Sequence, residues 1–425
     1  MKKRILSVLT ATALAAASFS ALAINAAAEE DIVYEGITFA PWTSTTSLPT
    51  SGSYYLTGDV SVSAVNNLMQ GQKLDLLLNG HSITKTGSNS SSVYNLGNGS
   101  VFSLYDNSSE IHYYTPNDGA AATVGSGDSV FYGGYITGAA ACFIQLINRG
   151  TFNMYGGNIV GMTSKSGSSV SVNGGTFNMY DGAILGCYSS YSGSGGGGVS
   201  VMSGGTFNMC GGAIKDNRTK GFNFGGGVFF SSGTFNVSGD VVIRDNKRGG
   251  TIENVYFKNG SKLGIGEDGL SANADIGLSP EFGVALPLVL VDGAAGYEDA
   301  FVSDYATASL ALNQDGQLVM TAEKLATAVY EKESDEDFTS ETETDNIASL
   351  WTVTVTTGSE SITDLRVKVK DTEGKFHGSE DVYDRPVISG GSVVVAVVVN
   401  HAAADVAGIT TAVNGLDITA TTASE

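Results

Sequence analysis

The sequence predicts an all-β protein whose middle is a right-handed, three-sided parallel β-helix solenoid, followed by a small C-terminal β-sandwich-like domain. A nearly identical segment recurs four times, and its copies start 25, 30 and 28 residues apart. Side chains alternate with a period of two inside these copies, and this region shows no helical periodicity. Glycine is abundant, with 56 residues, whereas charged residues make up only 15% of the chain. Self-similarity at this period is typical of a solenoid.

The copies differ from one another at only a few positions. They read GTFNMYGG at Gly150–Gly157, GTFNMYDG at Gly175–Gly182, GTFNMCGG at Gly205–Gly212 and GTFNVSGD at Gly233–Asp240. Two weaker copies precede them, at Ser100–Asn107 and Ser129–Gly138. A leucine-rich repeat horseshoe is the alternative solenoid, but it needs a leucine framework and a helix-forming arm that these repeats lack.

Each repeat contains three short strand-like pieces separated by glycine-rich turns. In the middle piece, Phe152 and Met154 point to one side, whereas Thr151 and Asn153 point to the other. Stacking the coils about 4.8 Å apart buries the apolar side and pairs the backbone groups. We therefore expect two inward ladders, one of Phe152, Phe177, Phe207 and Phe235 and one of Met154, Met179, Met209 and Val237.

The N-terminus has the pattern of a secretory signal peptide. Lys2, Lys3 and Arg4 precede an apolar run from Ile5 to about Ala23, and small residues offer cleavage sites after Ala23 or Ala28. No later stretch has the roughly 20 apolar residues that a membrane helix needs. We expect a secreted or extracellular cell-surface protein with no integral membrane segment once residues 1–28 are removed.

The remaining chain divides by composition into five parts. Residues 29–71 are polar and should cap the first coil, residues 72–255 carry the repeats, and residues 256–328 should supply capping strands. Residues 329–348 hold eight carboxylates and predict a solvated acidic linker. Residues 349–425 alternate well and predict the small β-sandwich-like domain.

The net charge disfavours some classes of partner, and the cysteine count bears on disulfide bonding. The formal charge of −21 disfavours nucleic acid and anionic membranes as partners. The three cysteines, Cys142, Cys187 and Cys210, are too few and odd in number for a disulfide framework, and we interpret them as small buried apolar residues. A disulfide between Cys187 and Cys210 is the alternative interpretation.

The sequence predicts no catalytic or metal-binding residues, and no cofactor is expected. Asp216 and Asp245 fall at similar places in successive coils, each followed by an Asn, and are best interpreted as turn residues. None of the four histidines has a partner at metal-ligand spacing.

Variable turns offer a candidate binding edge. They follow Gly161, Gly186 and Asp216, and stacking would place them along one edge, where aromatic and cationic side chains could meet a sugar or a protein surface. The candidate binding residues are Lys165, Tyr188, Tyr191, Arg218, Lys220, Phe222 and Phe224.

The repeats also resemble a known group of proteins. The GTFNMYGG units are similar to the repeats of adhesin-like β-helix surface proteins from anaerobic gut and rumen bacteria, and Leu74–Ile83 is similar to the opening rung of pectate-lyase-like β-helix proteins. The resemblance covers roughly residues 72–255. It implies a secreted or surface protein that binds glycans or host or bacterial surface proteins. The enzymes of that group carry Asp-Asp and Gly-His-Gly motifs, which this chain lacks.

The sequence therefore favours a non-enzymatic adhesin-like protein. The alternative is a polysaccharide lyase or glycoside hydrolase on the same scaffold. Two lesser alternatives are a structural spacer and an ice-binding face formed by the outward Thr and Asn ladders, for which ordinary strand propensity is a sufficient explanation.

Overall fold

The structure is a computed structural model that describes residues 30–322, apart from residues 88–91, 148, 166, 192–194, 221–224, 259, 282–283 and 306–307. Beyond residue 322 it describes only the strands and their pairing. The predicted signal peptide and two of the predicted binding residues, Phe222 and Phe224, lie outside the described residues.

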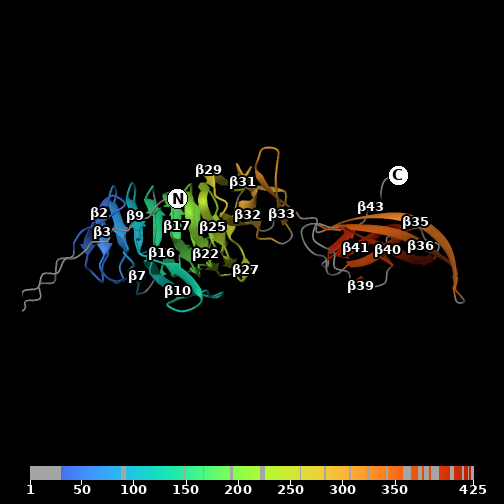
Figure 1. Ribbon diagram of the computed structural model, residues 1–425, viewed down its shortest axis with the longest axis horizontal. Coiled ribbons are helices and arrows are strands. Elements are labelled where there is room, and N and C mark those ends of the chain that lie inside the picture. The colour runs from blue at the N-terminus through green and yellow to red at the C-terminus, as the bar shows by residue number, and fades with distance from the viewer. Residues whose placement is uncertain are drawn as a thin grey trace, which may run out of the picture.

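The described chain is all-β and is dominated by one large, mostly parallel sheet, which is consistent with a β-helix or a related solenoid. Figure 1 shows its strands stacked one behind another along the long axis of the molecule. We call this arrangement the stack. Its strands form columns, in which each strand pairs in parallel with the equivalent strand of the next coil.

The columns follow the three pieces of each sequence repeat. The valine-rich column contains β5 (Asn66–Leu68), β8 (Tyr94–Leu96), β14 (Ile144–Ile147), β17 (Val170–Asn173), β21 (Val199–Met202), β24 (Val228–Phe230) and β28 (Val255–Phe257). The Phe-Met column contains β3 (Gly52–Leu56), β6 (Lys73–Leu77), β9 (Val101–Tyr105), β15 (Thr151–Met154), β18 (Thr176–Met179), β22 (Thr206–Lys215), β25 (Thr234–Arg244) and β29 (Leu263–Leu270).

Two further columns complete the coils. The third contains β4 (Val60–Val62), β7 (Ser82–Lys85), β13 (Tyr135–Ala140), β16 (Asn158–Ser164), β19 (Ala183–Leu185) and the later parts of β22 and β25. The fourth is short and places β20 (Tyr188–Ser189), β23 (Arg218–Thr219) and β26 (Lys247–Arg248) beside the end of β16.

The predicted inward ladders are confirmed. Phe152, Phe177, Phe207 and Phe235 pair in register, and all four are buried. Their rings stack with centroids 4.7–5.0 Å apart. Met154, Met179, Met209 and Val237 form the second buried ladder. Burial of these side chains between coils is the main stabilising term for the stack.

The outward side of the same strands carries a row of asparagines. Asn178 donates to Asn153 at 2.9 Å, Asn208 donates to Asn178 at 2.9 Å, and Asn236 donates to Asn208 at 3.0 Å. Each amide nitrogen therefore points toward the preceding coil. The row adds hydrogen bonds between coils that the backbone ladder does not supply.

Parallel pairing extends past the repeats on both sides. Within residues 29–71, β2 (Ile37–Trp42) pairs in parallel with β3, and β1 (Ile32–Tyr34) folds back antiparallel onto β2. After residue 255, β30 (Asp275–Ser279) pairs in parallel with β32 (Phe301–Ser303). The later strands β31 (Leu288–Asp292), β33 (Ala308–Leu312) and β34 (Leu318–Ala322) pair antiparallel at the far end.

One segment expected as a weak repeat folds differently. Ser129–Gly138 is split between two structures, because β12 (Ser129–Tyr132) joins β10 (Ile111–Thr115) and β11 (Thr123–Val124) in a separate antiparallel sheet. Gly133, with φ +87, provides the turn after which β13 re-enters the stack. Alternation in a strand does not reveal its partner, so the sequence pattern fits both arrangements. We call Ile111–Tyr132 the flap.

The acidic segment expected as a linker is part of a hairpin. β35 (Ala326–Ser340) and β36 (Glu343–Thr357) pair antiparallel, and β36 also pairs with β40 (Ser392–Ala402). The acidic positions face uncharged positions across the hairpin, as in the pairs Glu331–Thr352 and Asp335–Ser349. Like charges directly opposite would destabilise the pairing, and this register avoids them.

The rest of the predicted C-terminal domain contributes to two sheets. One has the strand order β40, β36, β35 and β43 (Thr421–Thr422). The other contains β37 (Leu365–Asp371), β38 (Phe376–His377), β39 (Val382–Tyr383), β41 (Val406–Val413) and β42 (Leu416–Thr419). Across the part of the chain that the structure describes, no helix is long and apolar enough to span a membrane.

Candidate functional site

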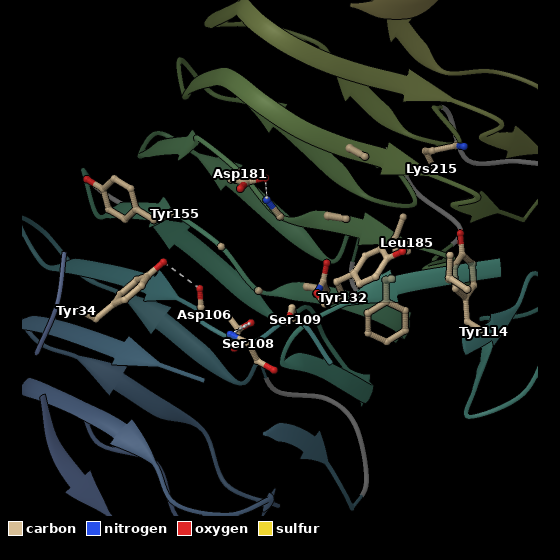
Figure 2. A pocket seen from close by; sticks show the side chains of 18 residues that line it. Tyr34, Asp106, Ser108, Ser109, Tyr114, Tyr132, Tyr155, Asp181, Leu185 and Lys215 are labelled. Atoms are coloured by element: carbon tan, nitrogen blue, oxygen red, sulfur yellow. Dashed lines mark hydrogen bonds between the residues drawn. The ribbon is translucent and has the colours of Figure 1, made fainter. Parts of the chain in front are cut away.

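A cleft of about 670 Å³ lies between the flap and the stack (Figure 2). Tyr34 and Asp106 lie toward one end of it, and Tyr114 and Lys215 lie toward the other. Aromatic and polar side chains dominate the lining, which includes Tyr34, Asp106, Ser108, Ser109, Tyr114, Val130, Phe131, Tyr132, Tyr155, Asn158, Asp181 and Lys215.

The flap forms one wall of the cleft because its inner face is packed on the stack. Tyr114 and Phe131 are buried against Val160 and Leu185 of the third column. The amide of Ala122 also donates to the carbonyl oxygen of Gly186 at 2.7 Å. The wall is therefore held by apolar burial and by a backbone bond, and the cleft is preformed.

Polar contacts tie the flap to the corner of the stack. The Tyr114 hydroxyl donates to the Asp216 carboxylate at 2.7 Å. Asp118 lies 3.1 Å from both Arg218 and Lys247. Hydrogen bonds from Lys247 and Arg218 lower the pKa of Asp118, so its carboxylate remains charged and engaged.

A row of tyrosines runs along the stack at the cleft. Tyr105, Tyr155 and Tyr180 follow the Phe-Met strands of successive coils, and their rings stack with centroids 4.9 and 4.8 Å apart. Tyr105 is buried, whereas Tyr155 and Tyr180 are 41% and 42% exposed. Because the faces of the rings stack on each other, the row presents ring edges and hydroxyl groups to solvent.

Asp106 holds the point at which the chain leaves the stack for the flap. Its carboxylate accepts the amides of Gly80 at 2.8 Å and Ser108 at 3.2 Å. Burial raises the pKa of Asp106, although these bonds and one from Gly134 act in the opposite direction. These hydrogen bonds show that Asp106 mainly anchors the local backbone.

Asp181 lines the same cleft two coils farther along. The register Leu104–Met154–Met179 continues to Asp106, Gly156 and Asp181, so the two residues occupy roughly equivalent backbone positions about 10 Å apart along the axis. Asp181 is exposed, and its carboxylate accepts the amide of Gly182 at 2.7 Å. Lys215, at the far end, pairs with Asp245 at 3.4 Å.

The residues predicted as a binding edge lie mainly along the fourth column, beyond the cleft. Tyr188 pairs in register with Arg218, and Lys165 and Lys220 follow the paired strand ends of their coils. Lys165, Tyr191 and Lys220 are exposed, whereas Tyr188 is half-buried. Arg218 is only 4% exposed, because its guanidinium contacts Asp118, Asp216 and the carbonyl oxygens of Asn217 and Asp245.

Asp216 and Asp245 occupy a left-handed corner, as their interpretation as turn residues requires. Their φ angles are +58 and +60, and the equivalent corners of the preceding coils use Gly161 and Gly186 with φ +61 and +58. Asn217 and Asn246 follow these corners and donate to the carbonyl oxygens of Ile184 and Ile214 at 2.9 and 2.8 Å. The repeated Asp-Asn pairs therefore build the corner and do not form a carboxylate pair in the cleft.

Sequence reasoning missed the cleft itself. Tyr155 and Tyr180 each follow an inward Met, so their outward position in adjacent coils was a usable signal. The flap gave no comparable signal, because its strand β12 fits the repeat pattern.

The structure also bears on metal binding and disulfide formation. No group of three or more His, Cys, Asp or Glu side chains in the described parts of the chain could hold a metal ion. All three cysteines are free thiols, with Cys142 and Cys187 buried and Cys210 half-buried.

Comparison with known proteins adds no assignment. No protein-family model matches this chain, and no curated protein or solved structure is significantly similar to it.

Proposed function

We propose that this chain is a secreted or cell-surface, adhesin-like protein that binds glycans in the cleft and carries out no catalysis. The proposed scaffold is a right-handed, three-sided parallel β-helix. The observation that carries the proposal is the cleft lining, where partly exposed tyrosines lie beside polar groups that hydrogen bonds hold in place.

The chemistry of the lining suits sugars. Aromatic rings contact the apolar faces of sugar rings, and a small number of placed polar groups fix orientation through their hydroxyls. Tyr34 and Tyr132 supply rings, Tyr155 supplies a ring edge and a hydroxyl group, and Ser108 and Asp181 supply donors and acceptors. A cleft of about 670 Å³ is large enough for a few sugar units.

A glycan array that includes mucin and neutral plant polysaccharides tests the proposal with the full secreted chain. Tyr155→Ala should weaken retention of the retained glycan, because it removes a ring from the cleft. Tyr191→Ala is the matched control, since Tyr191 is an exposed tyrosine that does not line the cleft. A loss with Tyr191→Ala alone would move the site to the edge predicted from the sequence. No retention of any glycan by the wild type would refute glycan binding.

Glycoside hydrolysis or a lyase reaction is the second candidate, and one observation favours it. Asp106 has a raised pKa and shares the cleft with Asp181, a pairing that resembles an acid and a base. Inverting hydrolases hold their carboxyl groups roughly 6.5–9.5 Å apart, and the backbone positions of Asp106 and Asp181 are two coils, about 10 Å, apart along the axis. The bonds from Gly80 and Ser108 to the Asp106 carboxylate weigh against a mobile acid.

Reducing-end release from the retained polysaccharide, or an unsaturated product detected by ultraviolet absorbance, decides between binding and catalysis. The binding proposal expects neither product from the wild type. Turnover that Asp106→Asn and Asp181→Asn both abolish would establish the enzyme instead.

A further inference from the structure

The outer face of the flap is an exposed apolar surface. Its inner face is already used, since Tyr114 and Phe131 are buried against the stack. The alternate positions, Ile111, Tyr113, Val130 and Tyr132, point outward and are 47–59% exposed. The register pairs Ile111 with Tyr132 and Tyr113 with Val130, so the four side chains form one contiguous face. We call these four residues the platform.

Folding does not account for the platform. The four side chains project away from the buried cluster that fixes the flap and stay about half exposed, so they add little burial in the single chain. Contiguous exposed apolar surface usually marks a binding site. Among the described residues, thirteen large apolar side chains are conspicuously exposed, and six of them are the platform together with Tyr155 and Tyr180. Three of these six, Val130, Tyr132 and Tyr155, line the cleft.

The platform continues directly from the cleft. Val130 and Tyr132 belong to both, because they line the cleft and also form half of the platform. They lie on β12, an outer strand of the flap sheet, and β10 with Tyr113 lies next to it. A chain that leaves the cleft across β12 therefore reaches Tyr113 next.

We infer that the platform binds further sugar units of a neutral glycan chain whose first units occupy the cleft. The inference rests on the proposed function and deepens it. Tyr113 and Tyr132 are diagonal neighbours across the strand pair, with Cα atoms about 7–8 Å apart, so one chain can contact both rings. Ile111 and Val130 extend the apolar surface beside them.

The negative charge of the protein favours neutral glycan chains. The protein carries a formal charge of −21, so an acidic polysaccharide is repelled at long range. Lys215, the cation in the cleft, is paired with Asp245, and Asp106 and Asp181 add negative charge at the same place. The flap is also fastened by Arg218, Lys247 and Asp216, so the platform is presented on a fixed support.

The test uses a length series of xylo-, cello- and manno-oligosaccharides, from disaccharides to octasaccharides, with Kd measured by calorimetry on the full secreted chain. Wild-type affinity should rise with chain length. Tyr113→Ala should weaken octasaccharide binding roughly three- to tenfold, the worth of one aromatic contact, and leave disaccharide binding unchanged. Tyr155→Ala should weaken both, and Tyr191→Ala should change neither.

The outcomes separate this inference from the proposal on which it rests. If Tyr113→Ala leaves octasaccharide binding unchanged, the platform does not bind sugar units, and the proposal that the cleft binds glycans is unaffected. Absence of binding by the wild type to the oligosaccharide series and the glycan array would overturn both. Sedimentation of the wild type and of Tyr113→Ala gives a third outcome. If the wild type is a dimer and the variant is a monomer, the platform is an interface between two copies and not a sugar-binding surface.

Discussion

The Nε atom of Arg218 lies 3.1 Å from a carboxylate oxygen of Asp118, across 100 positions of sequence. Asp118 lies in the flap, and Arg218 lies in the short fourth column of the stack. The Arg218 side chain is almost fully buried, whereas that of Asp118 is largely exposed. This ion pair joins an insertion to the coils on which it rests, and thereby helps to shape the cleft.

The two partners should contribute unequally to stability. Arg218→Met should cost about 1.5–3 kcal/mol, because Asp216 and the carbonyl oxygens of Asn217 and Asp245 lose a charged donor. Asp118→Asn should cost less than about 1 kcal/mol, because its side chain is mostly in water. Urea unfolding of the full chain measures both. Equal costs would show that Arg218 acts only through Asp118.

The asparagine row should respond according to position. Asn178 takes part in two bonds between coils, whereas Asn236 donates to Asn208 at the end of the row. Asn178→Ala should therefore cost about 2 kcal/mol and Asn236→Ala about 1 kcal/mol, at about 1 kcal/mol for each bond. Urea unfolding tests the ratio. Thr176→Ala, on the same outward side, is the control for altered strand propensity. A negligible cost for Asn178→Ala would show that water replaces these bonds fully.

Three buried carboxyl groups should make stability fall as pH rises from acid toward neutral, against the smaller opposite contribution of the exposed Asp118. Burial raises the pKa of Asp106, Glu253 and Asp304, so the folded state holds protons that the unfolded state has released. This contribution is complete below the usual values of 3.8 for Asp and 4.5 for Glu, and it is lost as pH rises through the raised values.

The melting temperature between acid and neutral pH measures this effect. Asp304→Asn should flatten the pH dependence, because it removes one of the three groups. Asp128→Asn removes the same charge from an exposed position of the flap region and should flatten it less. The same slope in both variants would assign the effect to overall charge repulsion.

Thiol reactivity should distinguish the cysteines. Burial raises the pKa of Cys142 to about 12 and that of Cys187 to about 11, so neither forms a thiolate readily at neutral pH. Cys210 is half-buried, and a chromogenic disulfide reagent should reach it first in the folded protein. Cys210→Ser should remove this fast labelling, and urea should expose the other two thiols. No labelling without a reductant would contradict the free state of the thiols.

Repetition explains why much of the stack could be predicted from the sequence. Phe152, Phe177, Phe207 and Phe235 occur at the same place in each repeat, and burial of that side leaves one register that stacks them. The corner at Asp216 and Asp245 is likewise local, because an Asp or Gly there adopts a positive φ. In both cases the determining residues are close in sequence or repeat at a fixed interval.

The candidate site could not be predicted from repeated or local sequence patterns. Arg218 was a predicted binding residue because it is a cation in a variable turn, yet the structure buries it against Asp118 and Asp216. The acidic run from Glu331 was predicted to be solvated linker, but its strand finds neutral partners such as Thr352. Asp118 lies 100 positions before Arg218, and in neither case does composition specify the partner.

The sequence by itself therefore determined the coil, its inward ladders and its corners, because a side-chain period of two and a repeat of 25 to 30 residues leave few ways to bury the apolar side. Only the tertiary structure decided that residues 111–132 leave the stack, fold back as the flap and form the cleft and the platform. Alternation within a strand indicates on which face each side chain lies, but not which strand pairs with it. The free energy of docking comes from contacts such as Phe131 on Leu185 and Tyr114 on Asp216, which exist only once distant segments meet.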